Sequence, residues 1–167
     1  PGQPLLPGKI YNSNLAYLTG RLKQLGCDIT EGCFVGDDTE AIVSAVRRSA
    51  AQADVILTTG GVSVGVKDLL PEVIEKLGAD LLFHGIDLKP GMPTMASIYN
   101  GKTIISLSGN PFSASAVFEL LMQPLIRKMT GSSHPVMVRK EAVLAHDYPG
   151  SIGSRRVLKA YDDGHAV

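Results

Sequence analysis

The strongest constraint on the fold is a short apolar strand that runs directly into a glycine-rich loop and then into a helix. Residues 54–58 (DVILT) have the length and composition of a buried strand, and the loop TTGGVSVG that follows ends at residue 65. Helical patterns lie on both sides, at residues 39–52 and 68–77. Such alternation of strands and helices predicts a parallel sheet with helices on its faces.

An amphipathic helix is predicted near the N-terminus, over residues 13–25. Its leucines recur at steps of three and four, which is the spacing of one helix face. Polar residues at 12–14 can cap its start, and Gly26 is a natural stop. Residues 27–35 then read as a strand that carries Cys27 and Cys33 on one face, too far apart to bridge each other. Both cysteines are therefore expected to be free thiols.

The middle of the chain has three strand-like runs, at residues 81–88, 94–99 and 103–107. Asn100-Gly101 lies between the last two runs and is a strong hairpin signal, so part of the sheet should be antiparallel. A long helix is predicted over residues 112–129, and Pro124 should kink or interrupt it.

A change of character marks the C-terminal part of the chain. Residues 131–135 read as a linker, and residues 136–144 and 155–161 resemble strands of a second, all-β unit that is too short to bury a core alone. The sequence therefore divides into an α/β domain, residues 1–133, and part of a C-terminal β domain, residues 134–167.

Charge and hydropathy exclude several classes of protein. Sixteen Lys and Arg balance sixteen Asp and Glu in 167 residues, so no basic field favours a nucleic-acid partner. No apolar stretch is long enough to span a bilayer, and the first residues, PGQP, lack the charged and apolar regions of a secretory signal. Together with two reduced thiols, these features favour a cytoplasmic protein.

Two loops are candidates for binding chemistry: TTGGVSVG at residues 58–65 and LSGNP at residues 107–111. Each follows a predicted strand and opens a helix, so both should lie at the carboxyl edge of the sheet, where open α/β sheets bind ligands. Glycines permit close approach of a ligand, and backbone N–H groups before a helix attract anions. Side by side, the loops favour a ligand with phosphate or another oxyanion. Either loop alone could also be a plain strand-to-helix turn, because neither the Walker A nor the GxGxxG fingerprint is present.

The charged residues near these loops each have two interpretations. Asp37, Asp38 and Asp68 could hold Mg²⁺ beside bound phosphates, or they could cap helices. Lys89, in the run DLKPG, could point its charge into the cleft or lie on the surface. The histidines form no pattern of metal ligands or of a catalytic triad. They are His84, His134, His146 and His165.

Five motifs in a fixed order make the chain resemble a known family. They are PGQPLLPGKIYNSN, the Asp37-Asp38 helix start, TTGGVSVG with Asp68 shortly after it, FHGIDLKPG and LSGNPFSA. Together they resemble the molybdopterin molybdenumtransferases, the family of MoeA and the gephyrin E domain, from about residue 1 to residue 131. The resemblance implies a three-layer α/β/α domain of the MoaB/Mog type with a mixed, mainly parallel sheet, followed by part of a C-terminal β-barrel domain.

The resemblance also implies an activity, the insertion of molybdate into adenylylated molybdopterin with Mg²⁺ or a similar divalent cation and release of AMP. The implied catalytic residues are Asp37, Asp68 and Lys89, of which the two aspartates are the implied metal ligands. The implied phosphate- and substrate-binding residues are Gly60, Gly61, Ser63, Gly65, Gly109 and Asn110. The implied molybdate-binding residues are Lys89, Pro93 and Ser113. The family further implies a homodimer, with a small-molecule substrate and other molybdenum-cofactor proteins as candidate partners.

Several positions depart from the pattern of this family. Met92 stands where the family usually has the second lysine of K-P-G-K-P, Ser108 replaces the first proline of L-P-G-N-P, and Asn12 stands where aspartate is frequent. The domain of the family also begins with a strand that ends in T-G-D-E-L, and no such motif precedes Pro1. The first strand of the fold is therefore expected to be missing.

Two other functions remain open. The first is that of a molybdopterin adenylyltransferase, which shares the fold and the TTGG loop and would suit a stand-alone domain. The second is a catalytically degenerate paralogue that binds molybdopterin or a partner protein, which Met92 and the missing strand suggest. Molybdate-triggered release of AMP would separate the metal-inserting enzyme from both.

Overall fold

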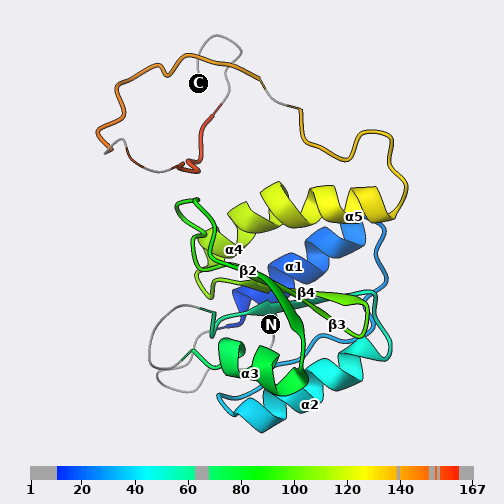
Figure 1. The fold of residues 1–167 in the computed structure, drawn as a ribbon. Helices are drawn as coiled ribbons and strands as arrows, with labels where there is room; N and C mark the ends of the chain where they lie inside the picture. Colours follow the sequence, from blue (N-terminus) through cyan, green and yellow to red (C-terminus); the bar gives the residue numbers. More distant parts are fainter. Residues whose placement is uncertain (1–10, 63–67, 139, 151–152, 154, 162–167) are drawn as a thin grey trace.

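The fold is built on one four-stranded sheet. The computed structural model describes residues 11–62, 68–138, 140–150, 153 and 155–161 (Figure 1). In spatial order the strands are β1 (Val55–Thr59), β4 (Lys102–Leu107), β3 (Met95–Tyr99) and β2 (Asp80–His84). β1 and β4 are parallel, whereas β3 is antiparallel to both of its neighbours, β4 and β2. A mixed sheet is thus confirmed. Three of its strands point the same way, but two of its three pairings are antiparallel.

The turn between β3 and β4 is the predicted hairpin. Asn100 and Gly101 have φ angles of 50° and 74°, and Tyr99 pairs with Lys102 directly across the turn. Two successive positive φ values are what a tight hairpin turn with the right-handed strand twist requires, and Asn-Gly supplies them at the lowest steric cost.

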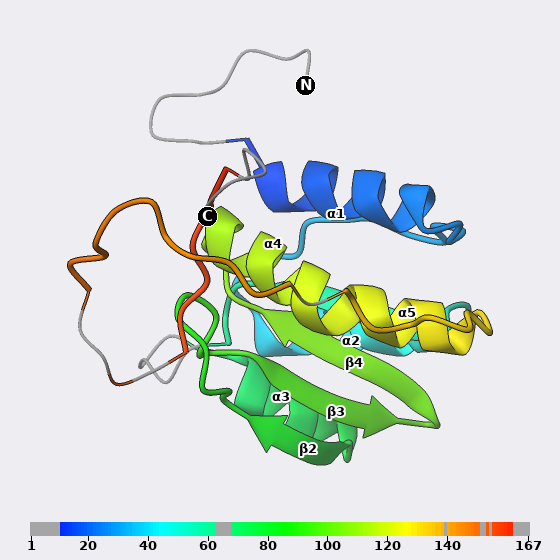
Figure 2. The same cartoon turned by 90° about the horizontal axis from the view of Figure 1, so that it is seen from above.

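Helices cover both faces of the sheet, which confirms the three layers (Figures 1 and 2). On one face α2 (Thr39–Ala50) and α3 (Leu70–Leu77) close a core with residues such as Ile104. On the other face α1 (Ser13–Gln24), α4 (Pro111–Val117) and α5 (Gln123–Met129) close a second core with residues such as Ile105. Neighbouring strand residues point to opposite faces, so β1, β3 and β4 each contribute to both cores.

The predicted break in the last long helix takes the form of a π-helical turn. The five residues Phe118–Met122 form this turn, η1, between α4 and α5, immediately before Pro124. Proline has no N–H, and its ring clashes with the carbonyl four residues earlier in a regular α-helix. The wider π turn removes this clash while the chain continues in nearly the same direction.

The segment 27–35 is not a strand, which corrects the prediction. It has no ladder partner among the described residues, and the side chain of Phe34 is 82% exposed. A run of β-branched and apolar residues forms a strand only when another backbone is available to pair with it. The cysteines in this segment, Cys27 and Cys33, are both free, as expected.

The predicted strands at residues 136–144 and 155–161 are also absent from the described residues there. The chain beyond α5 runs as an open trace (Figure 1), and Val138 is 96% exposed. One isolated parallel bridge joins Arg156 to Lys89. A strand needs a neighbouring backbone to pair with, and the described residues of this segment have no such ladder partner beyond that bridge. Within the described residues, no helix is both long enough and apolar enough to cross a membrane.

Candidate functional site

The two glycine-rich loops meet at the carboxyl edge of the sheet. The last register pair of β1 and β4 is Thr59 with Leu107, and one residue later the Gly60 N–H donates to the Leu107 carbonyl at 3.0 Å. A Cβ added at Gly109 would lie 3.4 Å from the Gly60 Cα, at van der Waals contact, so the two loop backbones lie directly beside each other. The prediction that these loops lie side by side at this edge is confirmed for their described parts.

Two hydrogen bonds hold the second glycine-rich loop at the peptide unit between Gly109 and Asn110. Asn14, which is 8% exposed on α1, donates from Nδ2 to the Gly109 carbonyl at 2.9 Å. The Asn110 N–H of the same peptide unit donates to the Ser108 hydroxyl at 3.2 Å. Both polar groups of this peptide therefore have partners, and its orientation is fixed. Sequence reasoning considered Asn14 only as a helix cap, whereas Asn12 is the residue that caps α1.

Asn110 begins α4 as its N-cap. Its side chain accepts a hydrogen bond from the Ser113 N–H at 3.0 Å, and Pro111 occupies the first helical position, which suits its fixed φ. The Ser113 residue is 3% exposed, and its hydroxyl has no hydrogen-bond partner among the described residues. A buried hydroxyl at a helix start that lacks a partner can donate to an oxyanion that reaches it.

The lysine loop, residues 85–94, leaves the sheet at the same edge. His84, the last residue of β2, is level with Met95 and Ser106 in the register, close to the end of β4. The loop is closed by backbone bonds from Gly85 N–H to the Thr94 carbonyl at 2.8 Å and from Ile86 N–H to the Met92 carbonyl at 3.0 Å. All three loops that carry predicted site residues therefore start from one edge.

A close contact fixes the lysine loop against α4. Gly91 has φ 130°, and a Cβ added there would lie 2.5 Å from Val117 Cγ2, so only glycine fits without movement. Lys89 and Met92 are exposed, and Pro93 is half-buried. The backbone of Lys89 is bonded to the C-terminal segment, with its N–H donating to the Arg155 carbonyl at 2.8 Å.

Asp37, Asp38 and Asp68 lie just before helices α2 and α3. Asp38 is the N-cap of α2 and accepts from the Ala41 N–H at 2.7 Å, so its capping interpretation is confirmed. Asp37 lies one residue earlier and is exposed. Asp68 is half-buried and lies two residues before α3, whose N-cap position is Leu69.

The helices that follow these two aspartates start at the same end of their layer. The Thr39 hydroxyl donates to Glu72 at 3.3 Å, and Lys76 pairs with Glu40 at 2.8 Å, so α2 and α3 lie side by side and parallel. Among the described residues, no three His, Cys, Asp or Glu side chains gather as a metal site. A cation held by Asp37 and Asp68 would therefore need oxygen ligands from its substrate.

Two predicted residues of the first loop, Ser63 and Gly65, lie outside the described residues. The described part of that loop has Gly60 and Gly61 in the left-handed region, with φ 87° and 64°. The Gly61 carbonyl accepts from the Leu70 N–H at 3.2 Å, which ties the loop to the start of α3.

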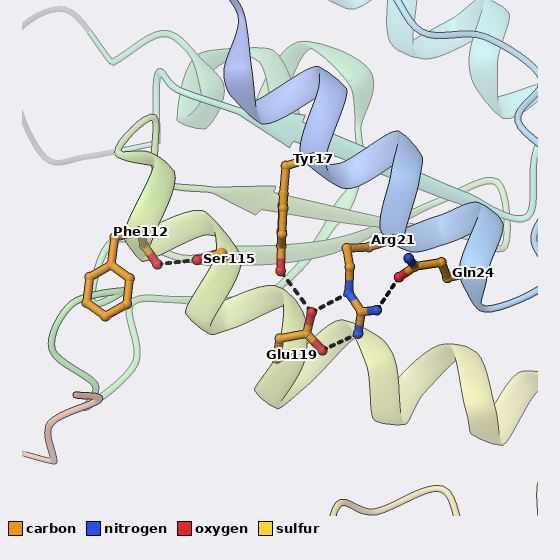
Figure 3. Close-up of polar contacts among 6 residues, drawn as sticks. All are labelled: Tyr17, Arg21, Gln24, Phe112, Ser115 and Glu119. Atoms are coloured by element: carbon orange, nitrogen blue, oxygen red, sulfur yellow. Dashed lines mark hydrogen bonds and ion pairs between the residues drawn. The ribbon is translucent and has the colours of Figure 1, made fainter. Parts of the chain in front are cut away.

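A polar cluster that sequence reasoning missed joins α1 to η1 (Figure 3). Arg21 donates to both oxygens of Glu119, at 2.6 and 2.7 Å, and the Tyr17 hydroxyl donates to the same carboxylate at 2.8 Å. These hydrogen bonds, that of Arg21 first, lower the pKa of Glu119, while burial raises the pKa of Tyr17. The cluster holds α1, and with it Asn14, against the helix that follows the second loop.

Comparison with known proteins places this chain in a family. A family model described as a probable molybdopterin binding domain matches residues 2–128. The molybdopterin molybdenumtransferase of Bacillus subtilis (strain 168) is 37% identical over 157 residues, which are 94% of this chain and 36% of that protein. The chain thus spans about a third of the length of this relative.

Solved structures share the fold. The molybdopterin biosynthesis MoeA protein from Pyrococcus horikosii has a TM-score of 0.67 at 35% identity, over 79% of this chain and 32% of that one. The MoaB protein from Thermus theromophilus has a TM-score of 0.56 at 21% identity, over 74% of this chain and 88% of that one, a likeness of fold alone. With the family model matching most of its length, the chain belongs to the family of probable molybdopterin binding domains.

Proposed function

We propose that this chain is the substrate-binding α/β part, residues 1–133, of an enzyme of molybdenum-cofactor biosynthesis. The reaction is insertion of molybdate into adenylylated molybdopterin with release of AMP. The single observation that carries the proposal is the junction of two glycine-rich loops, through Gly60 and Leu107, at the sheet edge from which the lysine loop also leaves. Relatives of 31–37% identity named molybdopterin molybdenumtransferase add support.

The first and second loops bind the phosphates of the nucleotide-bearing substrate in this proposal. Left-handed backbone at Gly60 and Gly61 turns the chain sharply at the edge of the sheet, and no side chain there blocks a ligand. Asn110 fixes the start of α4, and the Asn14 contact fixes Gly109. The phosphate-binding residues are Gly60, Gly61, Ser63, Gly65, Gly109 and Asn110.

The lysine loop and the start of α4 bind molybdate. Lys89 supplies a positive charge, and the buried Ser113 hydroxyl is a donor whose hydrogen-bonding capacity is unused among the described residues. Pro93 shapes the wall between them. An oxyanion is bound by hydrogen-bond donors and positive charges of this kind, and a nearby carboxylate would repel it.

Mg²⁺ or a similar divalent cation belongs to the proposal, with Asp37 and Asp68 as its ligands from this chain. When bound, such a cation neutralises charge on the phosphate oxygens of the substrate. The two aspartates precede the parallel helices α2 and α3, and the remaining ligands come from the substrate and water. Lys89, Asp37 and Asp68 are then the catalytic residues.

A calorimetric titration of the intact protein tests this function. Adenylylated molybdopterin is added with Mg²⁺ present, and molybdate follows while AMP is measured. Asp68→Ala should reduce AMP release at least a hundredfold, because the lost carboxylate holds the cation in the transition state. The matched control is Asp54→Ala, whose exposed ion pair with Lys102 lies at the amino end of the sheet. Full activity of Asp68→Ala at ordinary Mg²⁺ concentration would refute the metal assignment.

An adenylyltransferase activity is the second candidate, because that enzyme shares the α/β fold and the TTGG loop, which this chain has at residues 58–61. In that case the protein joins AMP from ATP to the phosphate of molybdopterin and releases pyrophosphate. Binding without either reaction would instead identify a degenerate paralogue. The proposal takes the intact protein as a cytoplasmic homodimer that acts on a small molecule, with neither nucleic acid nor membrane as partner, and with residues 134–167 as part of a C-terminal β domain.

A further inference from the structure

His84 connects two loops that lie far apart in the sequence. Its Nε2 is 3.0 Å from the Val62 carbonyl oxygen, in a partly buried contact across 22 residues. His84 is the last residue of β2 and immediately precedes the lysine loop, whereas Val62 belongs to the first glycine-rich loop. A carbonyl oxygen can only accept, so Nε2 carries the hydrogen in this contact.

Three successive residues of the first loop are each bonded to a different element. Gly60 and Gly61 are bonded through main-chain groups, and Val62 through the imidazole. Their partners are the Leu107 carbonyl of β4, the Leu70 N–H of α3 and His84 Nε2 of β2. Of these three bonds, only the one between His84 and Val62 involves a side chain, so it is the only one of the three that a substitution can remove without altering the main chain.

The anchored position of Val62 makes this bond effective. The Val62 side chain is 1% exposed and packs in the core between the sheet and the α2–α3 layer, so the residue cannot move as a whole. What the imidazole holds is the Val62 carbonyl, and with it the direction in which the described part of the loop, residues 60–62, leaves β1.

The residue after His84 is also held by a hydrogen bond. The next residue, Gly85, donates from its N–H to the Thr94 carbonyl at 2.8 Å, which closes the lysine loop at its base. One side chain therefore ties the base of the lysine loop to the glycine-rich loop. If either loop moves, this hydrogen bond must break or the other loop must move with it.

We propose that His84 is a positioning residue that sets the orientation of the phosphate-binding loop relative to the lysine loop. The inference rests on the function proposed above, in which these loops bind the two parts of the substrate. His84 touches no reacting atom in this role. It acts through the Val62 carbonyl, and the neutral and the protonated imidazole can both donate from Nε2.

Two matched substitutions test the proposal in the intact protein. Glutamine places its amide nitrogen about as far from the backbone as Nε2, whereas asparagine is too short to reach. His84→Gln should keep the KM for adenylylated molybdopterin within about twofold of the parent, whereas His84→Asn should raise it about five- to tenfold, the effect of one lost hydrogen bond. The kcat should change less than the KM. Equal KM values in the two variants would overturn the proposal.

Amide hydrogen exchange supplies a readout that does not depend on activity. The Gly60 and Leu70 N–H groups report the loop, because both are bonded across it. Their exchange should accelerate in His84→Asn and in the still shorter His84→Ser, and stay at the parent rate in His84→Gln. If the parent releases no AMP, the proposed function fails while this readout still decides the role of His84. Unchanged exchange in both short variants would overturn the positioning role even in an active enzyme.

Discussion

At the scale of single residues, Met92 is the position where this chain differs most in charge from the family it resembles. The Met92 side chain is 54% exposed. Its main-chain carbonyl accepts hydrogen bonds from the N–H groups of Ile86 and Thr94, at 3.0 and 2.8 Å. The main chain of this loop is thus held independently of the side chain at position 92. A lysine there would add a positive charge near Lys89 without changing the loop.

Met92→Lys should therefore tighten molybdate binding. The expected gain is about fivefold in Kd, as for one partly solvated charge-assisted hydrogen bond. Calorimetric titration with molybdate, in the presence of adenylylated molybdopterin, measures it. Met92→Gln has a similar length without the charge and should bind as the parent does. If the lysine and glutamine variants bind molybdate equally, residue 92 does not face the molybdate site.

The residues that join the loops could not be predicted from the sequence. The glycines, Asn110 and Lys89 stand in recognisable motifs at predicted strand ends. Asn14 and His84 act through hydrogen bonds to carbonyls that are 95 and 22 residues away. Such bonds depend on how the layers pack, and no local pattern marks them. The histidines form no motif in the sequence, because His84 bonds to a main-chain carbonyl and not to another side chain.

At the scale of helices and strands, the cluster of Tyr17, Arg21 and Glu119 is the clearest stabilising feature. Glu119 lies in the π turn and faces α1, where Arg21 meets both of its oxygens (Figure 3). The side chains of Arg21 and Glu119 are 28% and 26% exposed. A bidentate pair with this degree of burial is worth more than an ordinary surface ion pair.

Glu119→Gln should lower the free energy of unfolding by about 1 kcal/mol near neutral pH. It should also flatten the acid limb of stability. Because the native pKa of Glu119 is lowered from 4.5, the unfolded chain binds this proton first as the pH falls. The stabilisation is thus complete above about pH 4.5 and is lost as the pH falls from there through the lowered native pKa.

Urea unfolding at several pH values between neutral and acid measures this effect. Glu31→Gln is the control, because the ion pair between Glu31 and Arg48 is longer, at 3.5 Å, and more exposed. That variant should change the stability by less than about 0.5 kcal/mol. An acid limb in Glu119→Gln as steep as that of the parent would show that Glu119 does not titrate as described.

Most elements could be predicted because their signals are local. The cap at Asn12, the Asn100-Gly101 turn and the interruption before Pro124 all arise within a few residues. The failures were strands, at residues 27–35, 136–144 and 155–161. A strand needs a neighbouring backbone, and β propensity alone does not provide one. The sequence pattern marks only the proline, so it could not predict that the helix break would take the form of a π turn.

At the scale of the whole molecule, the two cores are joined through a single sheet. Ile104 and Ile105 are neighbours on β4, 1% and 3% exposed, yet Ile104 belongs to the core under α2 and α3, and Ile105 to the core under α1 and α4. β4 is also the parallel partner of β1 and the antiparallel partner of β3. The two glycine-rich loops start from the ends of β1 and β4, so these loops and both cores should share one unfolding event.

Ile104→Ala and Ile105→Ala test this coupling across the sheet. Each should cost about 2–4 kcal/mol, because a large buried side chain is removed from a packed core. If the layers unfold together, either substitution accelerates hydrogen exchange by roughly thirtyfold or more in α3 and in α4 alike. Leu81→Ala is the control, because Leu81 on β2 is 53% exposed and should change exchange little. Acceleration confined to the layer that faces the substituted side chain would mean that the two cores open independently, and that the loops between them are held by one layer at a time.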